Sequence, residues 1–150
     1  MLTPGTYLQN RYEILERIGS GGMSVVYKAR CHTLDRLVAI KVLKEEFTSD
    51  DTFVKKFKME AQAAARLSNP NIVNVYDVVD EGELHYIVME LVDGITLKQY
   101  IEKKGKMETK EAIGVALQVA KGIAAAHENH IIHRDIKPQN IIISRDGKVK

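Results

Sequence analysis

The sequence predicts an α+β fold, and three features of its 150 residues support this class. Short segments rich in β-branched and aromatic residues occupy most of the first part of the chain. A single helical pattern interrupts them, and after Val92-Asp93-Gly94 the pattern becomes helical. The strands that we expect are 12–18, 24–30, 36–43, 72–79 and 84–91.

Alternation and turn residues define these strands. Segment 36–43 alternates strictly, because Val38, Ile40 and Val42 fall on one face of a strand and the residues between them on the other. Glycines separate the first two strands, and Asp80-Glu81-Gly82 separates the last two. The sequence therefore predicts five strands, with a turn between the first two and another between the last two.

Helical spacing marks three further segments. Over 51–67 apolar residues recur every three or four positions, and Asn69-Pro70-Asn71 stops the pattern. Thr96 is a candidate N-cap for a short helix that ends at Gly105. A longer helix is expected over 109–128.

Composition excludes several classes of protein. The apolar fraction of 45% and the charged fraction of 28% are those of a globular domain, and a net charge of +2 gives no indication of nucleic-acid binding. The single cysteine, Cys31, has no partner for an internal disulfide. There is no signal-peptide pattern and no apolar run of about 18 residues, so we expect a cytoplasmic domain or the cytosolic part of a larger protein.

The first candidate site is the glycine-rich segment "IGSGGMSVVYKA", residues 18–29. Gly19, Gly21 and Gly22 leave the backbone accessible to a phosphate, whose oxygens would accept hydrogen bonds from backbone N–H groups. Ser24 stands where a G-x-G-x-x-G pattern has its last glycine, and no helix is expected directly after it. The alternative is a glycine-rich hairpin turn without a ligand.

The second candidate is the pair Lys41 and Glu60. Lys41 shares a strand face with apolar residues, and Glu60 falls within the apolar stripe of the helix over 51–67. Because unpaired charges are costly to bury, we expect the two to form an ion pair between strand and helix. The alternatives are that both side chains reach solvent or that the pair is purely structural.

The third candidate is "HRDIKPQN", residues 133–140. Asp135 is a possible base for a hydroxyl group, Lys137 a cation for a phosphoryl group, and Asn140 an oxygen ligand for a hard metal ion. Pro138 stiffens the loop. Isoleucines on both sides are expected to anchor the segment in a core, whereas the alternative is a solvated polar turn.

The histidines near this loop have a simpler interpretation. His127, His130 and His133 are spaced by three residues, as ligands of a metal can be. Asn129 is expected to end the helix between them, so the three rings would not share a face. We expect no transition-metal site here.

The segments "GSGGMSVV", "VAIK" and "HRDIKPQN" occur in the order of the glycine-rich loop, strand lysine and catalytic loop of eukaryotic-like (Hanks-type) protein kinases, and the chain resembles that family. The resemblance implies a protein-kinase-like fold. It comprises a five-stranded antiparallel small lobe with one helix over residues 1–91, followed over 92–150 by a hinge and an incomplete large lobe.

The resemblance also implies roles for single residues, with ATP and Mg²⁺ or Mn²⁺ as cofactors. Lys41 would hold the α- and β-phosphates, oriented by Glu60. Asp135 would be the catalytic base, Lys137 a γ-phosphate contact and Asn140 the metal ligand. The remaining nucleotide contacts would be the loop residues Ile18, Gly19, Ser20, Gly21, Gly22 and Met23, the adenine contacts Val26 and Ala39, the gatekeeper Met89, and the hinge residues Glu90 and Val92.

Lysine two positions after Asp135 resembles serine/threonine kinases, and Arg134 resembles kinases that are regulated by phosphorylation of the activation loop. The opening "RYEILERIGSGGMSVVYKA" is similar to the bacterial PASTA-type kinases. That similarity implies protein substrates with Ser or Thr acceptors, self-association through the small lobe, and a membrane tether in the full-length protein.

No Asp-Phe-Gly motif occurs in the 150 residues. We therefore expect about the first half of a kinase domain, truncated before that motif and inactive by itself. The alternative is a non-catalytic module for nucleotide binding or dimerisation, either a pseudokinase or a truncated product.

Overall fold

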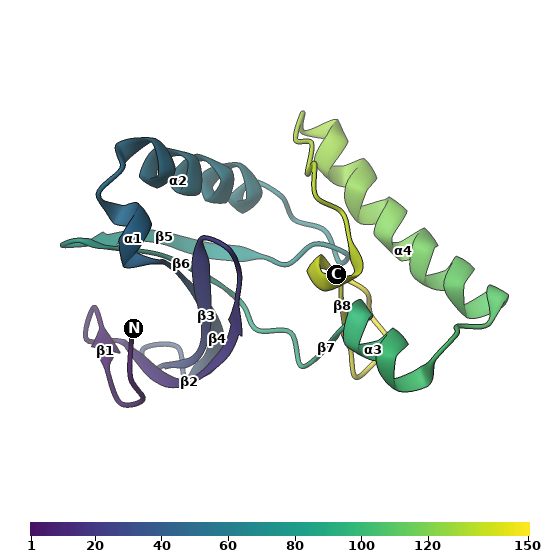
Figure 1. The fold of residues 1–150 in the computed structure, drawn as a ribbon, viewed down its shortest axis with the longest axis horizontal. Coiled ribbons are helices and arrows are strands. Elements are labelled where there is room, and N and C mark those ends of the chain that lie inside the picture. Colours follow the sequence, from purple (N-terminus) through teal and green to yellow (C-terminus); the bar gives the residue numbers. More distant parts are fainter. The chain divides into compact units, whose positions relative to one another are not determined.

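The first of two units is built on an antiparallel sheet (Figure 1). The computed structural model describes residues 1–150. All five predicted strands are present, with a two-residue strand added at the edge, in the order β1-β2-β3-β4-β6-β5. The bounds are β1 Tyr7–Leu8, β2 Tyr12–Ser20, β3 Ser24–Cys31, β4 Arg36–Leu43, β5 Val75–Glu81 and β6 Leu84–Glu90.

Alternation along β4 supplies the main core of this unit. Val38, Ile40 and Val42 are buried on one face, as predicted, together with Tyr27 of β3 and Tyr86 of β6. Burying such side chains stabilises the fold by roughly 25 cal/mol for each Å² of apolar surface removed from water, and this is the dominant favourable contribution for a sheet of this kind. The other face of β4 is left for the helix.

Helix α2, Asp51–Ala65, covers that second face. It begins at Asp50, whose carboxylate accepts a hydrogen bond from the Thr52 N–H at 2.9 Å. Phe57 and Ala61 pack against Leu43 and Ile87 of the sheet. A short helix that was not predicted, α1 (Glu45–Thr48), connects β4 to α2.

The second unit comprises Leu67–Val73 and Val92–Lys150, whereas the division drawn from the sequence assigned 67–73 to the first part. The small core of this unit is formed by Leu97, Ile141 and Val149. Its elements are β7 Gly94–Thr96, α3 Leu97–Lys104, α4 Thr109–Glu128, the 3₁₀ turn η1 Pro138–Asn140 and β8 Ile142–Ser144.

The predicted caps of α3 are confirmed. The Thr96 hydroxyl accepts a hydrogen bond from the Gln99 N–H at 3.1 Å, and the Gln99 side chain accepts one from the Thr96 N–H at 3.0 Å. This reciprocal pair is a capping box. Gly105, with φ of 81°, ends the helix as the sequence predicted.

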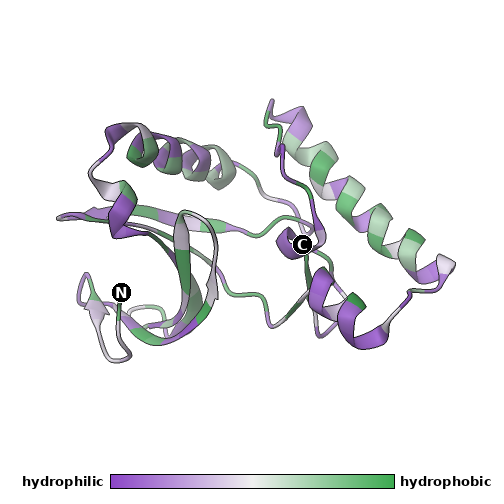
Figure 2. Cartoon of the chain, in the orientation of Figure 1, coloured by the Kyte–Doolittle hydropathy of each residue, from purple (hydrophilic) through white to green (hydrophobic).

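Hydrophobic residues recur along much of helix α4 (Figure 2). Ile113 and Leu117 are 62% and 56% exposed. No helix of the chain combines the length and hydrophobicity needed to cross a membrane.

Residues 67–73 are held to the rest of their unit by Asn71. Its amide nitrogen donates to the Val149 carbonyl at 2.8 Å and to Gln118 Oε1 at 3.2 Å. On α4, Gly122 is buried where a Cβ atom would lie 2.6 Å from the Asn71 carbonyl oxygen. The close approach of this segment to α4 therefore requires glycine at position 122.

Candidate functional site

The glycine-rich loop is a short turn between β2 and β3. The Gly21 N–H donates to the Ser24 carbonyl at 2.8 Å, which closes the turn. A Cβ atom built on Gly22 would meet no atom within 4 Å, so the tip of the turn is open to a ligand. Gly19 pairs with Val26 across the two strands, which places the turn directly beyond Val26.

Strand register places further predicted nucleotide contacts on one face of the sheet. Val26 lies opposite Lys41, and Ala39 lies opposite Met89. Lys41 also lies opposite Ile87, which packs in the cluster under α2. Because directly opposed residues of antiparallel strands point to the same side, all of these side chains share the face that holds Lys41.

Glu60 does not pair with Lys41, which corrects the expected ion pair between strand and helix. No carboxylate lies within 4.0 Å of the Lys41 ammonium, and Glu60 is exposed. The buried residues of α2 are Phe57 and Ala61, so Glu60 lies at the edge of the apolar stripe. From that edge a long charged side chain reaches water, where its charge is solvated at little cost.

The predicted hinge residues lie where the first unit ends and the second begins. Glu90 is fixed at the end of β6 by Asn74. The Glu90 N–H donates to the Asn74 carbonyl at 2.8 Å, and the Asn74 N–H donates to Glu90 Oε1 at 3.1 Å. Val92 begins the longer of the two segments that form the second unit. Asn74 could not be recognised from the sequence, since its contact with Glu90 depends on the pairing of β5 with β6.

The second unit brings three predicted catalytic residues together. Lys137 Nζ lies 3.2 Å from Asp135 Oδ2. The Asn140 side-chain nitrogen donates to the Asp135 carbonyl at 2.9 Å and to Asp135 Oδ2 at 3.3 Å. The side-chain nitrogen of Asn140 therefore donates to Asp135. Its Oδ1 is the side-chain atom that can accept a hydrogen bond or ligate a metal.

The backbone around Asp135 is held in an unusual conformation. Arg134 has φ of 70°, a left-handed conformation that is uncommon outside glycine. The Asp135 N–H donates to His133 Nδ1 at 3.1 Å. His133 thus stabilises the loop locally, a role that the sequence did not predict for it.

Only one of the two isoleucine flanks anchors this loop in a core. Ile141 is buried after η1, and its carbonyl accepts a hydrogen bond from the Leu97 N–H at 2.8 Å. On the other side Ile132 is 66% exposed, contrary to the expectation. The loop is fixed from its C-terminal side, through α3 and the β7–β8 pair.

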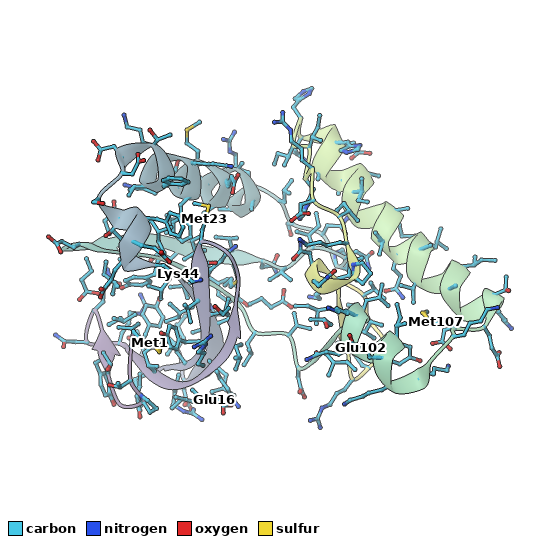
Figure 3. The ribbon with its side chains drawn as sticks, viewed as in Figure 1. Met1, Glu16, Met23, Lys44, Glu102 and Met107 are labelled. Carbon is cyan, nitrogen blue, oxygen red and sulfur yellow. The ribbon has the colours of Figure 1, made fainter.

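One residue that sequence reasoning missed contacts the glycine-rich turn. Lys44, which follows β4, donates from Nζ to the carbonyl of Gly21 at 2.7 Å and to that of Gly22 at 3.1 Å. Figure 3 labels Lys44 together with Met23 of the same turn. A lysine after a strand has no distinguishing pattern in the sequence, so only the fold could reveal this contact.

Comparison with known proteins agrees with these features. The sequence matches the protein kinase domain over residues 12–150. A protein of Clostridium perfringens named a probable serine/threonine-protein kinase is 53% identical over 146 residues, which are 97% of this chain and 21% of the relative. Serine/threonine-protein kinase PrkC of Bacillus subtilis is 48% identical over 146 residues, which are 97% of this chain and 22% of PrkC.

The fold agrees as well. The crystal structure of the PknI kinase domain of Mycobacterium tuberculosis superposes with a TM-score of 0.86 at 28% identity, over 99% of this chain and 61% of that one. This confirms the protein-kinase-like fold that the sequence predicted. The chain spans about a fifth of the length of these two curated relatives. On the family match and these relatives together, the chain belongs to the protein kinase domain family.

Proposed function

We propose that this chain contributes the nucleotide-binding and catalytic-loop elements of an ATP-dependent serine/threonine protein kinase, which transfers the γ-phosphoryl group to Ser or Thr hydroxyls of proteins. The observation that supports it most is the cluster in which Asn140 and Lys137 both contact the carboxylate of Asp135. The relatives named serine/threonine kinases support the acceptor class, as does the lysine two positions after Asp135.

The residues of the first unit suit a nucleotide with its phosphates. The open turn at Gly22 offers backbone N–H groups without a side chain in the way. Val26 is half-buried and offers apolar surface for a base, and the buried Ala39 lies on the same sheet face, which also holds the Lys41 ammonium. An apolar surface next to a cation and free amides matches the chemistry of an adenine nucleotide.

The residues of the second unit suit a divalent cation and a hydroxyl acceptor. Asn140 Oδ1 is an oxygen ligand of the kind that Mg²⁺ and Mn²⁺ prefer. When bound, the metal and ATP supply the phosphoryl group and the neutralisation of its charge. Asp135 accepts the proton of the acceptor hydroxyl. Lys137, next to that carboxylate, neutralises negative charge on the phosphoryl group that is transferred. Asn140 keeps the carboxylate oriented by donating to it.

Phosphoryl transfer tests this proposal in the protein that carries these residues. With ATP, Mg²⁺ and a generic protein substrate, we expect transfer to Ser and Thr, and a loss of about 10²- to 10⁴-fold in kcat for Asp135→Asn because the base is removed. Glu83→Gln makes the same change from carboxylate to amide at an exposed hairpin turn and should leave kcat unchanged. Full activity in Asp135→Asn would contradict the role of the base.

We further propose that residues 1–150 by themselves bind nucleotide but transfer phosphate slowly. Among them, the resemblance to kinases supplies Asn140 alone as a metal ligand, and Mg²⁺ takes about six oxygen ligands in octahedral geometry. Titration of the 150-residue chain with ADP and Mg²⁺, alongside the transfer assay, checks both halves. Transfer by this chain at the rate typical of a complete kinase domain would contradict the proposed slow transfer.

A further inference from the structure

Lys44 is a residue that the proposed function leaves without a role. It follows β4 directly and stands at the start of α1. Its side chain donates to the Gly21 and Gly22 carbonyls, and its own N–H donates to the Met23 carbonyl at 2.9 Å. No carboxylate lies within 4.0 Å of its ammonium. Lys44 therefore donates hydrogen bonds to three consecutive carbonyl groups of the glycine-rich turn.

The geometry of the peptide bond gives these contacts a consequence. In a trans peptide the C=O and the N–H of the next residue point in opposite directions. The Gly21 carbonyl shares a peptide unit with the Gly22 N–H, and the Gly22 carbonyl shares one with the Met23 N–H. Because Lys44 binds both carbonyls from one side, both N–H groups point away from it.

These two N–H groups are the ones in the turn that lack a partner. The Gly21 N–H is bound to the Ser24 carbonyl, whereas the Gly22 and Met23 N–H groups make no hydrogen bond within the chain. Two adjacent free N–H groups that point to the same side form a concave anion-binding site of the kind that accepts phosphate oxygens. Lys44 thus fixes the donors of the turn without occupying them.

Glycine makes such a restraint necessary. Gly21 and Gly22 can rotate into conformations that other residues avoid, so an unrestrained turn has many orientations of these peptide units. A ligand that needs one orientation then binds more weakly, in proportion to the population of that orientation. The Lys44 ammonium group lies 2.7 Å and 3.1 Å from the two carbonyl oxygens, and these contacts favour one orientation of the peptide units.

We propose that Lys44 is a positioning residue for nucleotide binding, which orients the Gly22 and Met23 N–H groups toward the phosphates of the ligand. The inference rests on the proposed function for the identity of the ligand. The restraint of the turn by Lys44 is independent of the proposed function, because it is a property of the protein without ligand. Two measurements separate these parts.

The first measurement is the backbone mobility of the ligand-free chain, by ¹⁵N heteronuclear NOE at Gly22 and Met23. We expect lower NOE values in Lys44→Met than in the wild type, and values near the wild type in Lys44→Arg, which keeps N–H donors and charge. Lys56→Met is the matched control, because it removes an exposed lysine of α2. Equal NOE values in Lys44→Met and Lys56→Met would overturn the restraint.

The second measurement is the affinity for ADP and for adenosine, which lacks the phosphates. Loss of a hydrogen-bonded restraint of about 1 kcal/mol corresponds to ADP binding weakened about threefold to tenfold in Lys44→Met. Adenosine binding should be unchanged, and Lys44→Arg should restore most of the ADP affinity. An equal loss for ADP and adenosine would overturn the assignment, since it would indicate a general disturbance of the unit.

Charge alone could also weaken ADP binding, and ionic strength separates this effect. At about 1 M salt the Debye length falls to about 3 Å, so an effect of long-range charge disappears. The loss in Lys44→Met should persist there if orientation of the turn is its cause, and its disappearance would overturn the proposal. A wild-type chain that binds neither ADP nor tripolyphosphate would contradict the proposed function and the assigned ligand, while the NOE comparison would still decide on the restraint.

Discussion

At the scale of single residues, two glycines of α4 meet opposite surroundings. Gly122 is buried, and a Cβ atom there would lie 2.6 Å from the carbonyl oxygen of Asn71. Gly114 has no atom within 4 Å of the corresponding position. Backbone atoms cannot move aside as a flexible side chain can, so the same substitution should have opposite effects at the two sites.

We therefore expect Gly122→Ala to destabilise the chain by about 1–3 kcal/mol, the usual cost of overpacking. Gly114→Ala should stabilise it by about 0.5–1 kcal/mol, because alanine loses less conformational entropy in a helix. Thermal unfolding followed by circular dichroism measures both, and Gly114→Ala is the matched control. Equal stability of the two variants would show that Asn71 moves away from α4 freely.

The candidate site shows which residues can be predicted from local patterns. Asp135, Lys137 and Asn140 lie within one short motif, and the structure brings them into contact. Glu60 was placed wrongly, since helical periodicity gives the direction of a side chain only approximately and a glutamate at the edge of a stripe can reach solvent. Lys44 could not be predicted, because its partners lie 22 and 23 residues earlier in the chain.

At the scale of elements, α2 is connected to the β5–β6 hairpin by one carboxylate. Asp80 of β5 forms an ion pair with Lys58 of α2 and lies 2.5 Å from Nδ1 of His85 of β6. Hydrogen bonds from Lys58, and then from His85, hold the pKa of Asp80 below its ordinary value. The charged form of Asp80 is thus favoured by folding, and its protonation weakens the connection between helix and hairpin.

The sign of the pH dependence follows from this lowered pKa. The contribution of Asp80 to the free energy of unfolding is fully present above the unfolded pKa of about 3.9, and it is lost as pH falls through the lower pKa of the folded state. Because the Asp80 side chain is 39% exposed, we expect a contribution of only about 0.2–1 kcal/mol.

Urea unfolding of the wild type and Asp80→Asn measures this contribution. The difference in unfolding free energy between the two should be present at about pH 5 and should shrink toward zero at about pH 2.5, on either side of the ordinary aspartate pKa. Glu83→Gln removes a carboxylate from the same hairpin, at an exposed position without an ion pair, and should show a smaller difference at both pH values. A difference for Asp80→Asn that is constant with pH would contradict the coupling to Lys58 and His85.

At the scale of the whole molecule, local sequence patterns predicted most helices and strands but not which segments belong to which unit. The alternation in β4 and the caps of α3 are properties of a few neighbouring residues, and both were predicted. The place of residues 67–73 in the second unit was not predicted, because it depends on the contact of Asn71 with Val149, 78 residues later in the chain. Strand β1 has only two residues, too few for a periodic pattern.

The division into two units also separates two steps of the proposed function, and thermal stability can distinguish them. Lys41 lies in the first unit and Asp135 in the second. In the proposed function Lys41 binds phosphates, whereas Asp135 acts on the acceptor hydroxyl. A ligand that binds only the folded state stabilises it by about 2.7 kcal/mol at a concentration of 100 times its Kd. Loss of Lys41 should therefore reduce the stabilisation by ADP, and loss of the Asp135 charge should not.

We expect ADP with Mg²⁺ to raise the melting temperature of the wild type and of Asp135→Asn by similar amounts, and that of Lys41→Met by much less. Lys55→Met, which removes an exposed lysine of α2, should respond like the wild type and so exclude a general effect of positive charge. Differential scanning calorimetry with and without ADP gives all four shifts. If Lys41→Met responded fully, its ammonium would not bind the phosphates. If Asp135→Asn lost its response, the carboxylate would take part in binding the nucleotide itself.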